Sequence, residues 1–349
     1  MPTKEDLKYF QSMPLDIKVA MTKTRIREWV NHYGESGTYI SFSGGKDSTV
    51  LLHLVRELYP DIPAVFVNTG LEYPEIQSFV KSFDNVVILR PKMSFSEVIR
   101  KYGYPFISKE VSCVVYDCKK AKMAGKPPPD YRIKRLTGTL TNKNGEKSRY
   151  CCEKYLPLLD VDFMVSSHCC DVMKKAPVHN YAKTSDRVTI TGQMAAESAL
   201  RKQQWLMNGC NAFESKNPVS NPMSFWLERD VLQYVYENNL PIASVYGDVV
   251  KDNDQLSFDD TDLNSCKFCT SKCQRTGCIF CGFGAHLDEC SRFLLLKETH
   301  PKQYNYCIRG GEYDIDGLWK PNKDGLGMGH VFDVLNELYS KNGKPFIEY

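Results

Sequence analysis

Apolar and polar positions follow two different periods in the first part of the chain. Short runs of β-branched and aromatic residues indicate buried strands, and the longer segments between them have the three- and four-residue apolar spacing of amphipathic helices. The predicted strands are 38–42, 64–67 and 86–89, and the predicted helices are 16–33, 48–58, 72–82 and 94–101. This alternation predicts an α/β fold with a doubly wound, mostly parallel sheet.

The pattern is less regular in the rest of the chain. The polar, basic stretch at 112–150 predicts an insertion with little core of its own. Core signals return at 155–165, with a strand at 187–191, helices at 197–208, 228–238, 287–299 and 330–341, and a polar, then cysteine-rich loop at 247–273. We therefore predict an N-terminal helical segment at 1–35, a nucleotide-binding α/β domain at 36–245, and a Cys-rich segment with C-terminal helices at 246–349.

A glycine-rich segment, Ser-Gly-Gly-Lys-Asp-Ser, lies between the first predicted strand of the sheet and the helix after it. Adjacent glycines let backbone N–H groups approach an anion, the serines add hydroxyl donors, and the helix N-terminus adds partial positive charge. Asp47 suits such a site only beside a cation such as Mg²⁺. The spacing is not that of the Walker-type loop. We predict that nucleotide phosphates bind Ser43, Gly44, Gly45, Lys46, Asp47 and Ser48.

Two further turns follow predicted strands and face the same edge of the predicted sheet. Asn68, Thr69 and Gly70 end the second strand, and Gly192 follows the strand at 187–191. Ligands of parallel sheets bind at the carboxyl ends of the strands. We therefore predict that these four residues contact the nucleotide.

Composition narrows the class of protein. The 349 residues contain no apolar run long enough to cross a membrane, and the N-terminus lacks the layout of a signal peptide, so we predict a cytoplasmic protein without membrane contact. Fourteen cysteines in such a protein favour metal or redox chemistry over disulfides. The net charge of +3 is uninformative, but 118–150 holds ten Lys/Arg against two acidic residues. This basic stretch makes nucleic acid a candidate acceptor.

The cysteines fall into groups that suit metal ligation. Cys169-Cys170 is followed by Lys174-Lys175, and far downstream Cys278 and Cys281 form a Cys-x-x-Cys turn between glycines. Four thiolates complete a zinc or an iron–sulfur site. Three cysteines just before that turn bind zinc themselves, replace one ligand, or are ordinary thiols: Cys266, Cys269 and Cys273. The other adjacent pair, Cys151-Cys152, lacks the lysines that follow Cys169-Cys170.

Several motifs occur in an order that resembles the phosphoadenosine phosphosulfate (PAPS) reductase family. They are SGGKDSTVLLHL, FVNTGLEYPE, the Cys-Cys with Lys-Lys-x-Pro behind it, TGQMAAESALR, NPMSFWLERDVLQYV and GCIFC, between residues 37 and 307. The loop itself is similar to the SGGxDS pyrophosphate loop of N-type ATP pyrophosphatases, which split ATP between its α and β phosphates.

This resemblance implies roles for individual residues. In the adenylylsulfate-reducing branch, an adjacent Cys pair and a later Cys-x-x-Cys bind a [4Fe–4S] cluster, so the implied ligands are Cys169, Cys170, Cys278 and Cys281. The turn near 192 carries arginines for the sulfonucleotide in the reductases, whereas this chain has Met194 there and keeps Arg201. Lys46, Asp47 and Arg201 are the implied catalytic residues.

Two features depart from the reductases of that family. Their nucleophilic cysteine lies near the C-terminus, whereas 333–349 contains no cysteine and Cys307 is the last one. Their phosphate loop tends to be degenerate, whereas this one is intact. Both departures favour an enzyme that binds ATP and Mg²⁺ and adenylates an acceptor with pyrophosphate release, for sulfur transfer, with a sulfur donor as partner.

Two alternatives remain at the level of sequence. One is a PAPS or adenylylsulfate reductase that uses Cys307 or the thiol of a reductant protein as nucleophile. The other is a zinc-stabilised nucleotide-binding scaffold without catalytic activity.

Overall fold

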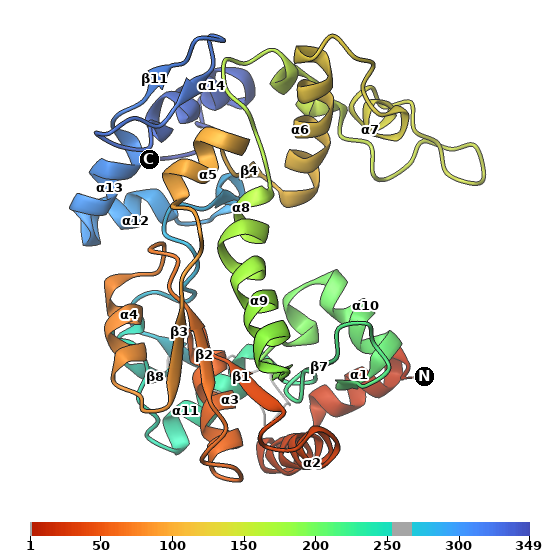
Figure 1. Cartoon of the computed structure of the whole chain (residues 1–349), viewed down its shortest axis with the longest axis vertical. Helices are drawn as coiled ribbons and strands as arrows, with labels where there is room; N and C mark the ends of the chain where they lie inside the picture. The colour runs from red at the N-terminus through yellow and green to blue at the C-terminus, as the bar shows by residue number, and fades with distance from the viewer. Residues whose placement is uncertain (1, 253–266) are drawn as a thin grey trace, which may run out of the picture. The chain divides into compact units, whose positions relative to one another are not determined.

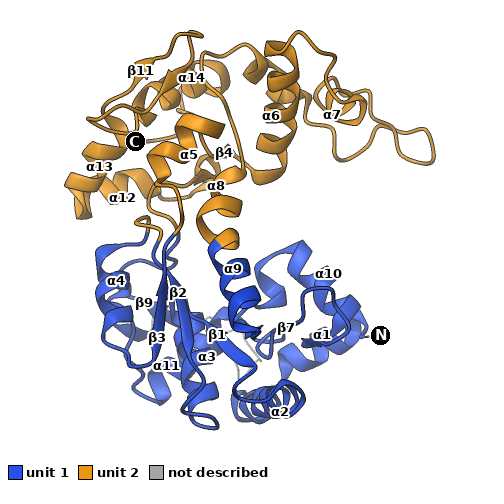
Figure 2. Ribbon diagram, viewed as in Figure 1, with its two compact units in different colours: residues 1–68, 72–90, 177–277 blue, residues 69–71, 91–176, 278–349 orange. Residues whose placement is uncertain are grey.

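The computed structural model describes residues 2–252 and 267–349, which form two compact units (Figure 2). Unit 1 comprises residues 1–68, 72–90 and 177–277, and unit 2 comprises 69–71, 91–176 and 278–349. The units are thus interleaved in the sequence, whereas the predicted segments are consecutive. The predicted N-terminal helical segment, the glycine-rich loop and the start of the Cys-rich segment all belong to unit 1.

Unit 1 contains the central sheet, whose strand order is β3-β2-β1-β5-β7-β6. The strands are β1 (Thr38–Ser41), β2 (Ala64–Val67), β3 (Val86–Leu89), β5 (Val188–Ile190), β6 (Asn211–Ala212) and β7 (Val219–Ser220). Every neighbouring pair is parallel except β6 and β7. This confirms the predicted α/β fold with a mostly parallel sheet.

The helices of unit 1 pack around this sheet (Figure 1). They are α1 (Lys4–Ser12), α2 (Leu15–Tyr33), α3 (Lys46–Arg56), α4 (Pro74–Lys81), α9 (Ala176–Ser185), α10 (Ala199–Asn208) and α11 (Glu228–Glu237), with short turns η3 (Ala195–Glu197) and η4 (Ser244–Tyr246). The buried Lys18 Nζ lies 2.6 Å from Asp230 Oδ2, and Trp226 Nε1 donates to Thr22 Oγ1 at 2.8 Å. These contacts fix α11 against α2, and with it the position of Glu228.

Unit 2 is mostly helical. It contains α5 (Phe95–Tyr102), α6 (Lys109–Met123), α7 (Asp130–Leu136), α8 (His168–Cys170), α12 (Arg292–Thr299), α13 (Pro301–Ile308) and α14 (Met328–Tyr339), short turns η1 (Glu153–Leu159), η2 (Asp171–Lys175) and η5 (Ala285–Leu287), and strands β4 (Phe106–Ile107), β10 (Gly282–Phe283), β11 (Glu312–Tyr313) and β12 (Trp319–Lys320). Its core includes Phe332, whose ring lies 5.4 Å from that of Phe106 and 4.6 Å from that of Phe293.

Two sequence predictions need correction. The stretch at 112–150 does have core residues, because α6 buries Val114, Val115 and Cys118 completely or nearly so. Its apolar positions were obscured by the lysines between them. The predicted loop at 247–273 contains a pair of antiparallel strands, β8 (Val249–Asp252) and β9 (Lys267–Thr270). The part between these strands lies outside the described residues.

Helices α1, α9 and α13 were absent from the sequence prediction. Each has ten residues or fewer, and α9 and α13 carry a proline in the first turn. Across residues 2–252 and 267–349, none of the helices has the length and apolar character that a bilayer crossing requires.

Candidate functional site

The glycine-rich loop connects β1 to α3 in unit 1, as the sequence predicts. Gly44 has a φ of +72°, and a Cβ on it would lie 2.7 Å from Val80 and 2.8 Å from Ile76 of α4. A side chain at this position would therefore clash with a neighbouring helix as well as strain the backbone. The turn brings the loop directly to the N-terminus of α3, where backbone N–H groups are available to an anion.

The loop serines bond to the loop itself. The Ser48 hydroxyl donates to the Gly45 carbonyl at 2.9 Å and accepts from the Ser43 N–H at 3.2 Å. The two serine hydroxyls lie 3.0 Å apart. Ser43 and Ser48 thus hold the loop in shape, and the groups of the loop that remain to contact an anion are the backbone amides and Lys46.

Lys46 is buried and lies between two carboxylates. Its Nζ is 3.1 Å from Glu228 Oε1 and 3.6 Å from Asp47 Oδ1. Burial by itself would lower the pKa of Lys46, but Asp47 and Glu228 outweigh burial and raise it. Lys46 is therefore held as a cation beside the loop.

Asp47 has features that suit a divalent cation. Its Oδ1 is buried and makes no hydrogen bond, since Lys46 Nζ is just beyond hydrogen-bond range. Burial raises the pKa of Asp47, Lys46 opposes this increase, and Glu197 and Glu228 add to it. A hard cation such as Mg²⁺ takes carboxylate oxygens as ligands and would satisfy this oxygen. Asp47 thus fits the predicted magnesium site.

The loop borders a cavity of about 120 Å³. Its lining includes Ser43, Gly45, Lys46, Asp47, Met194, Glu197, Glu228, Tyr246, Arg275 and Thr276. Four of these residues were not predicted from the sequence as part of this site: Glu228, Tyr246, Arg275 and Thr276. Motifs in the sequence could have pointed to three of them, because Glu228 lies in the NPMSFWLERDVLQYV motif and Arg275-Thr276 directly precedes GCIFC.

These additional residues form a connected set around Lys46. Arg275 Nη2 lies 3.0 Å from Glu228 Oε2, so Glu228 binds both Lys46 and Arg275. The Tyr246 hydroxyl lies 2.6 Å from Thr276 Oγ1 and accepts from the Lys46 backbone N–H at 3.4 Å. Burial favours the neutral form of Glu228, but Lys46 and Arg275 together outweigh it and lower its pKa. The lining of the loop cavity therefore contains two cations, Lys46 and Arg275, and three carboxylates, Asp47, Glu197 and Glu228.

The other predicted nucleotide residues differ in position. Gly192 lies against the loop, since a Cβ on it would come within 3.1 Å of the Asp47 carbonyl oxygen. Arg201 does not line the cavity and pairs with Glu197, which does. Asn68 is outside the lining as well, and its N–H donates to Leu89 O within the sheet. Thr69 and Gly70 belong to unit 2.

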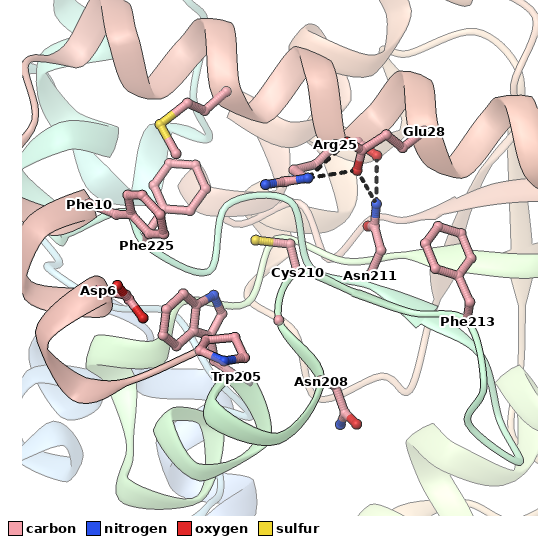
Figure 3. A pocket seen from close by; sticks show the side chains of 13 residues that line it. Asp6, Phe10, Arg25, Glu28, Trp205, Asn208, Cys210, Asn211, Phe213 and Phe225 are labelled. Carbon is pink, nitrogen blue, oxygen red and sulfur yellow. Dashed lines mark hydrogen bonds and ion pairs between the residues drawn. The ribbon is translucent and has the colours of Figure 1, made fainter.

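A larger cavity of about 370 Å³ lies elsewhere in unit 1 (Figure 3). Phe10, Trp205 and Phe225 form its apolar wall, and Arg25 and Glu28 pair on its polar side at 2.8 Å. Because these charges neutralise each other and the lining contains no glycine-rich turn, we place the candidate nucleotide site at the smaller cavity beside Lys46.

The four predicted cluster ligands meet in unit 2. Cys169, Cys170, Cys278 and Cys281 line one cavity, together with Leu71, Phe95, Pro105, Met173 and Lys174. The first pair comes from α8, and the second from the turn that leads into β10. Residues more than a hundred positions apart in the sequence are thus brought to one place, and the remaining lining is mostly apolar.

Strand β10 fixes the Cys-x-x-Cys turn. Gly282 pairs with Phe106 of β4, and a Cβ on Gly282 would lie 2.3 Å from the Phe106 ring. The Cys281 N–H donates to the Cys278 carbonyl at 3.0 Å, and Arg292 Nη1 donates to the Cys281 carbonyl at 3.1 Å. The glycine after the turn is therefore required for the close approach of the two strands.

Lysines accompany the cysteine pair. The hydrogen bond donated by the Cys169 thiol lowers the pKa of Cys170, burial acts in the opposite direction, and Lys109 and Lys174 add to the decrease. Positive charge near thiolates suits a centre that carries net negative charge. Lys174 was singled out in the sequence, whereas Lys109 was not.

The four thiols are a donor set that suits an iron–sulfur cluster or a zinc ion. Among residues 2–252 and 267–349, no group of three His, Cys, Asp or Glu side chains is placed to hold one metal ion. A [4Fe–4S] cluster binds its four thiolates through four different irons, so its ligands stand farther apart than those of one zinc ion. The four cysteines around one cavity supply the four thiolates that such a cluster takes.

The other cysteines within residues 2–252 and 267–349 do not line this cavity. Cys269 and Cys273 belong to unit 1, where Cys273 Sγ lies 2.9 Å from the Arg275 carbonyl oxygen, and Cys266 lies outside the described residues. Cys152 and Cys118 belong to unit 2, and burial raises the pKa of both.

The sequence matches the profile of the phosphoadenosine phosphosulfate reductase domain over residues 37–110 and 142–282, which is more than half of the chain. The chain belongs to the PAPS reductase family. The matched ranges include the glycine-rich loop and all four cavity cysteines, so both candidate centres lie within the family domain.

Two relatives of this PAPS reductase family protein illustrate the range of similarity. The uncharacterized protein MJ0973 of Methanocaldococcus jannaschii is 24% identical over 294 residues, which cover 80% of this chain and 50% of that protein. The phosphoadenosine 5'-phosphosulfate reductase of Xanthomonas euvesicatoria is 30% identical over 80 residues, 22% of this chain and 33% of that enzyme. The chain thus spans half or less of the length of these relatives.

Similar solved structures include the phosphoadenylyl-sulfate reductase of Candida auris. It has a TM-score of 0.37 and 14% identity, and the match covers 70% of this chain and 91% of that one. The FMN adenylyltransferase of Candida glabrata has a TM-score of 0.36 and 10% identity, with 69% of this chain and 64% of that chain covered.

Proposed function

We propose that this PAPS reductase family member binds ATP at the glycine-rich loop and adenylates an acceptor with release of pyrophosphate, as a step of sulfur transfer. The observation that carries the proposal is the intact loop at the N-terminus of α3, with the buried cation Lys46 and the carboxylate Asp47 beside it. A substrate without a β–γ pyrophosphate would not need such a loop.

The proposed reaction relies on positioning and charge. The β and γ phosphates bind the loop amides and Lys46, and an acceptor oxygen attacks the α phosphorus. A new oxygen–phosphorus bond forms as the bond from the α phosphorus to the bridging oxygen breaks, and pyrophosphate takes the electron pair. Lys46 and Arg275 stabilise the charge that develops on pyrophosphate. Asp47 would hold Mg²⁺, which supplies further charge neutralisation when bound.

We further propose that Cys169, Cys170, Cys278 and Cys281 hold a [4Fe–4S] cluster, with Lys109 and Lys174 compensating its charge. Such a cluster supplies sulfur or electron chemistry when it is bound. The void lined by four thiols, with lysines near Cys170, supports this assignment over a zinc-stabilised scaffold.

A sulfonucleotide reductase is the alternative that the family favours. The predicted nucleophile Cys307 is poorly suited to it, because its side chain is fully buried and burial raises its pKa. Cys290 is exposed, so a reductase would more readily use Cys290 or the thiol of a partner. Loss of sulfite formation in Cys290→Ala but not in Cys307→Ala would identify that nucleophile.

The deciding experiment uses protein purified without oxygen. Iron, sulfide and zinc are measured first, and pyrophosphate release from ATP is then compared with sulfite release from adenylylsulfate and from PAPS. We expect iron and sulfide in the protein, and pyrophosphate release that requires an acceptor. Sulfite formation without any pyrophosphate release would establish the reductase instead, and zinc without either activity would establish the scaffold.

A further inference from the structure

Residues 126–154 of unit 2 form a basic segment that the two candidate centres do not use. It holds eight Lys/Arg against three acidic residues. Helix α7 begins it, and a loop closed by a bridge between Thr141 and Lys147 follows, extending away from α6 (Figure 1). Most of its side chains are exposed, so core packing does not account for its composition.

A buried arginine, Arg135, connects this segment to α6 through hydrogen bonds. Arg135 is 4% exposed, its Nε donates to the Tyr150 carbonyl at 2.8 Å, and its Nη2 donates to Glu110 of α6 at 2.6 Å. Its guanidinium lies 5.9 Å from the ring centroids of both Tyr131 and Tyr150. Arg135 thus joins the two tyrosines to α6, and holds both rings near one fixed group.

The two tyrosine rings are open to solvent. Tyr131 is 52% exposed and Tyr150 is 44% exposed. Arg149 lies 5.0 Å from the Tyr150 ring and donates to its hydroxyl at 2.9 Å. Exposed aromatic rings beside arginines present flat faces on which another planar group can stack.

The other cations of this segment fall into two classes. Lys134 and Arg132 pair with Asp130 and Asp117 at 2.7 Å and 3.1 Å, so their charges are partly neutralised. The exposed Lys126 and Lys143 form no ion pair with any residue within 2–252 and 267–349. Together with Arg149, which lies over the Tyr150 ring, they leave positive charge on the same segment as the tyrosines.

We propose that this surface binds a single-stranded nucleic acid. Bases stack on Tyr131 and Tyr150, and the backbone phosphates contact Lys126, Lys143 and Arg149. Stacked rings with adjacent cations are the arrangement by which proteins bind single strands without reading sequence. The acceptor of the adenylation reaction is then a single-stranded nucleic acid. The adenylation of the bound strand rests on the proposed function, whereas the binding itself does not.

The test measures binding without ATP, so that its result is independent of catalysis. Fluorescence anisotropy compares labelled single strands of RNA and DNA of about 16 nucleotides with a duplex of the same sequence. We expect single strands to bind more tightly than the duplex. Whichever of RNA and DNA binds with the higher affinity is the kind of strand that this surface takes. Tyr131→Ala and Tyr150→Ala should each weaken binding about tenfold, whereas phenylalanine at either position should preserve it.

Two further sets of variants separate stacking from charge. Replacing Lys126, Lys143 and Arg149 by alanine should reduce the slope of log affinity against log salt by about 2. Tyr9→Ala is the matched control, because Tyr9 is 62% exposed on α1 in unit 1, and its binding should equal that of the wild type. Unchanged binding by the Tyr131→Ala, Tyr150→Ala double variant, or equal affinity for duplex, would overturn the proposal.

Discussion

The two candidate centres are built in different ways. In unit 1, a short contiguous loop carries the glycines, the lysine and the carboxylate, and ion pairs through Glu228 surround it. In unit 2, two pairs of cysteines come from distant segments and face a mostly apolar cavity. A contiguous loop largely specifies its own geometry, whereas the cysteine site exists only once β10 has paired with β4. Variants that separate the two centres test this comparison.

The largest expected effect is that of Lys46→Ala. Pyrophosphate release should fall about 10²- to 10³-fold, because a preorganised cation next to the leaving group is lost. Iron content should not change if the centres are independent. Lys8→Ala, an exposed lysine on α1, is the control and should retain full activity. If the activity of Lys46→Ala were within a few-fold of that of the wild type, the loop would have no part in the proposed reaction.

The converse variant removes a cavity thiol. Cys278→Ser and Cys281→Ser should lose most of the bound iron and the broad visible absorption of the cluster, because serine is a poor ligand for iron–sulfur centres. Pyrophosphate release should stay close to that of the wild type, since the loop lies in unit 1.

The control for the thiol variants is Cys210→Ser. Cys210 is buried in unit 1 and does not line the cysteine cavity, so this variant should keep its iron. Wild-type iron content in both cavity variants would refute the ligand assignment. Parallel loss of iron and pyrophosphate release would show that the two centres are not independent.

The difference between the centres also explains what could be predicted from sequence. The strands β1, β2 and β3 were predicted almost to the residue, because short apolar runs between turns are local signals. The loop was recognised for the same reason. Glu228 and Arg275 were missed as site residues, because their approach to Lys46 depends on how α11 packs against α2 and α3.

The cysteine site was predicted by another route. Spacing alone left zinc, iron–sulfur and several ligand sets open, and the resemblance to a family selected the four cysteines that now line one cavity. Lys109 could not have been assigned, since nothing in its local sequence relates it to Cys170. Residues near a site that come from another element require the tertiary structure.

A smaller effect is expected for Arg275, the second cation of the loop cavity. Arg275→Ala should raise the KM for ATP about tenfold, because one hydrogen-bonded charge is worth about 1.5 kcal/mol at a partly exposed site. Arg229→Ala is the control, since Arg229 is an exposed neighbour of Glu228 outside the cavity lining. An unchanged KM for Arg275→Ala would show that Arg275 does not contribute to ATP binding and would leave Lys46 as the cation that does.

The smallest expected effect is on stability and concerns Asp47. Burial raises the pKa of this carboxyl, so its ionised form costs folding free energy at neutral pH. Asp47→Asn should therefore stabilise unit 1 by about 1 kcal/mol and raise Tm by about 2 °C, measured without nucleotide or metal. The cost is present above the folded-state pKa and disappears as pH falls through it, so the gain should shrink in acid. The exposed Asp61→Asn should leave Tm unchanged. If Asp47→Asn lowers Tm instead, Asp47 is a structural partner of Lys46 and its orphaned oxygen is no argument for a cation site.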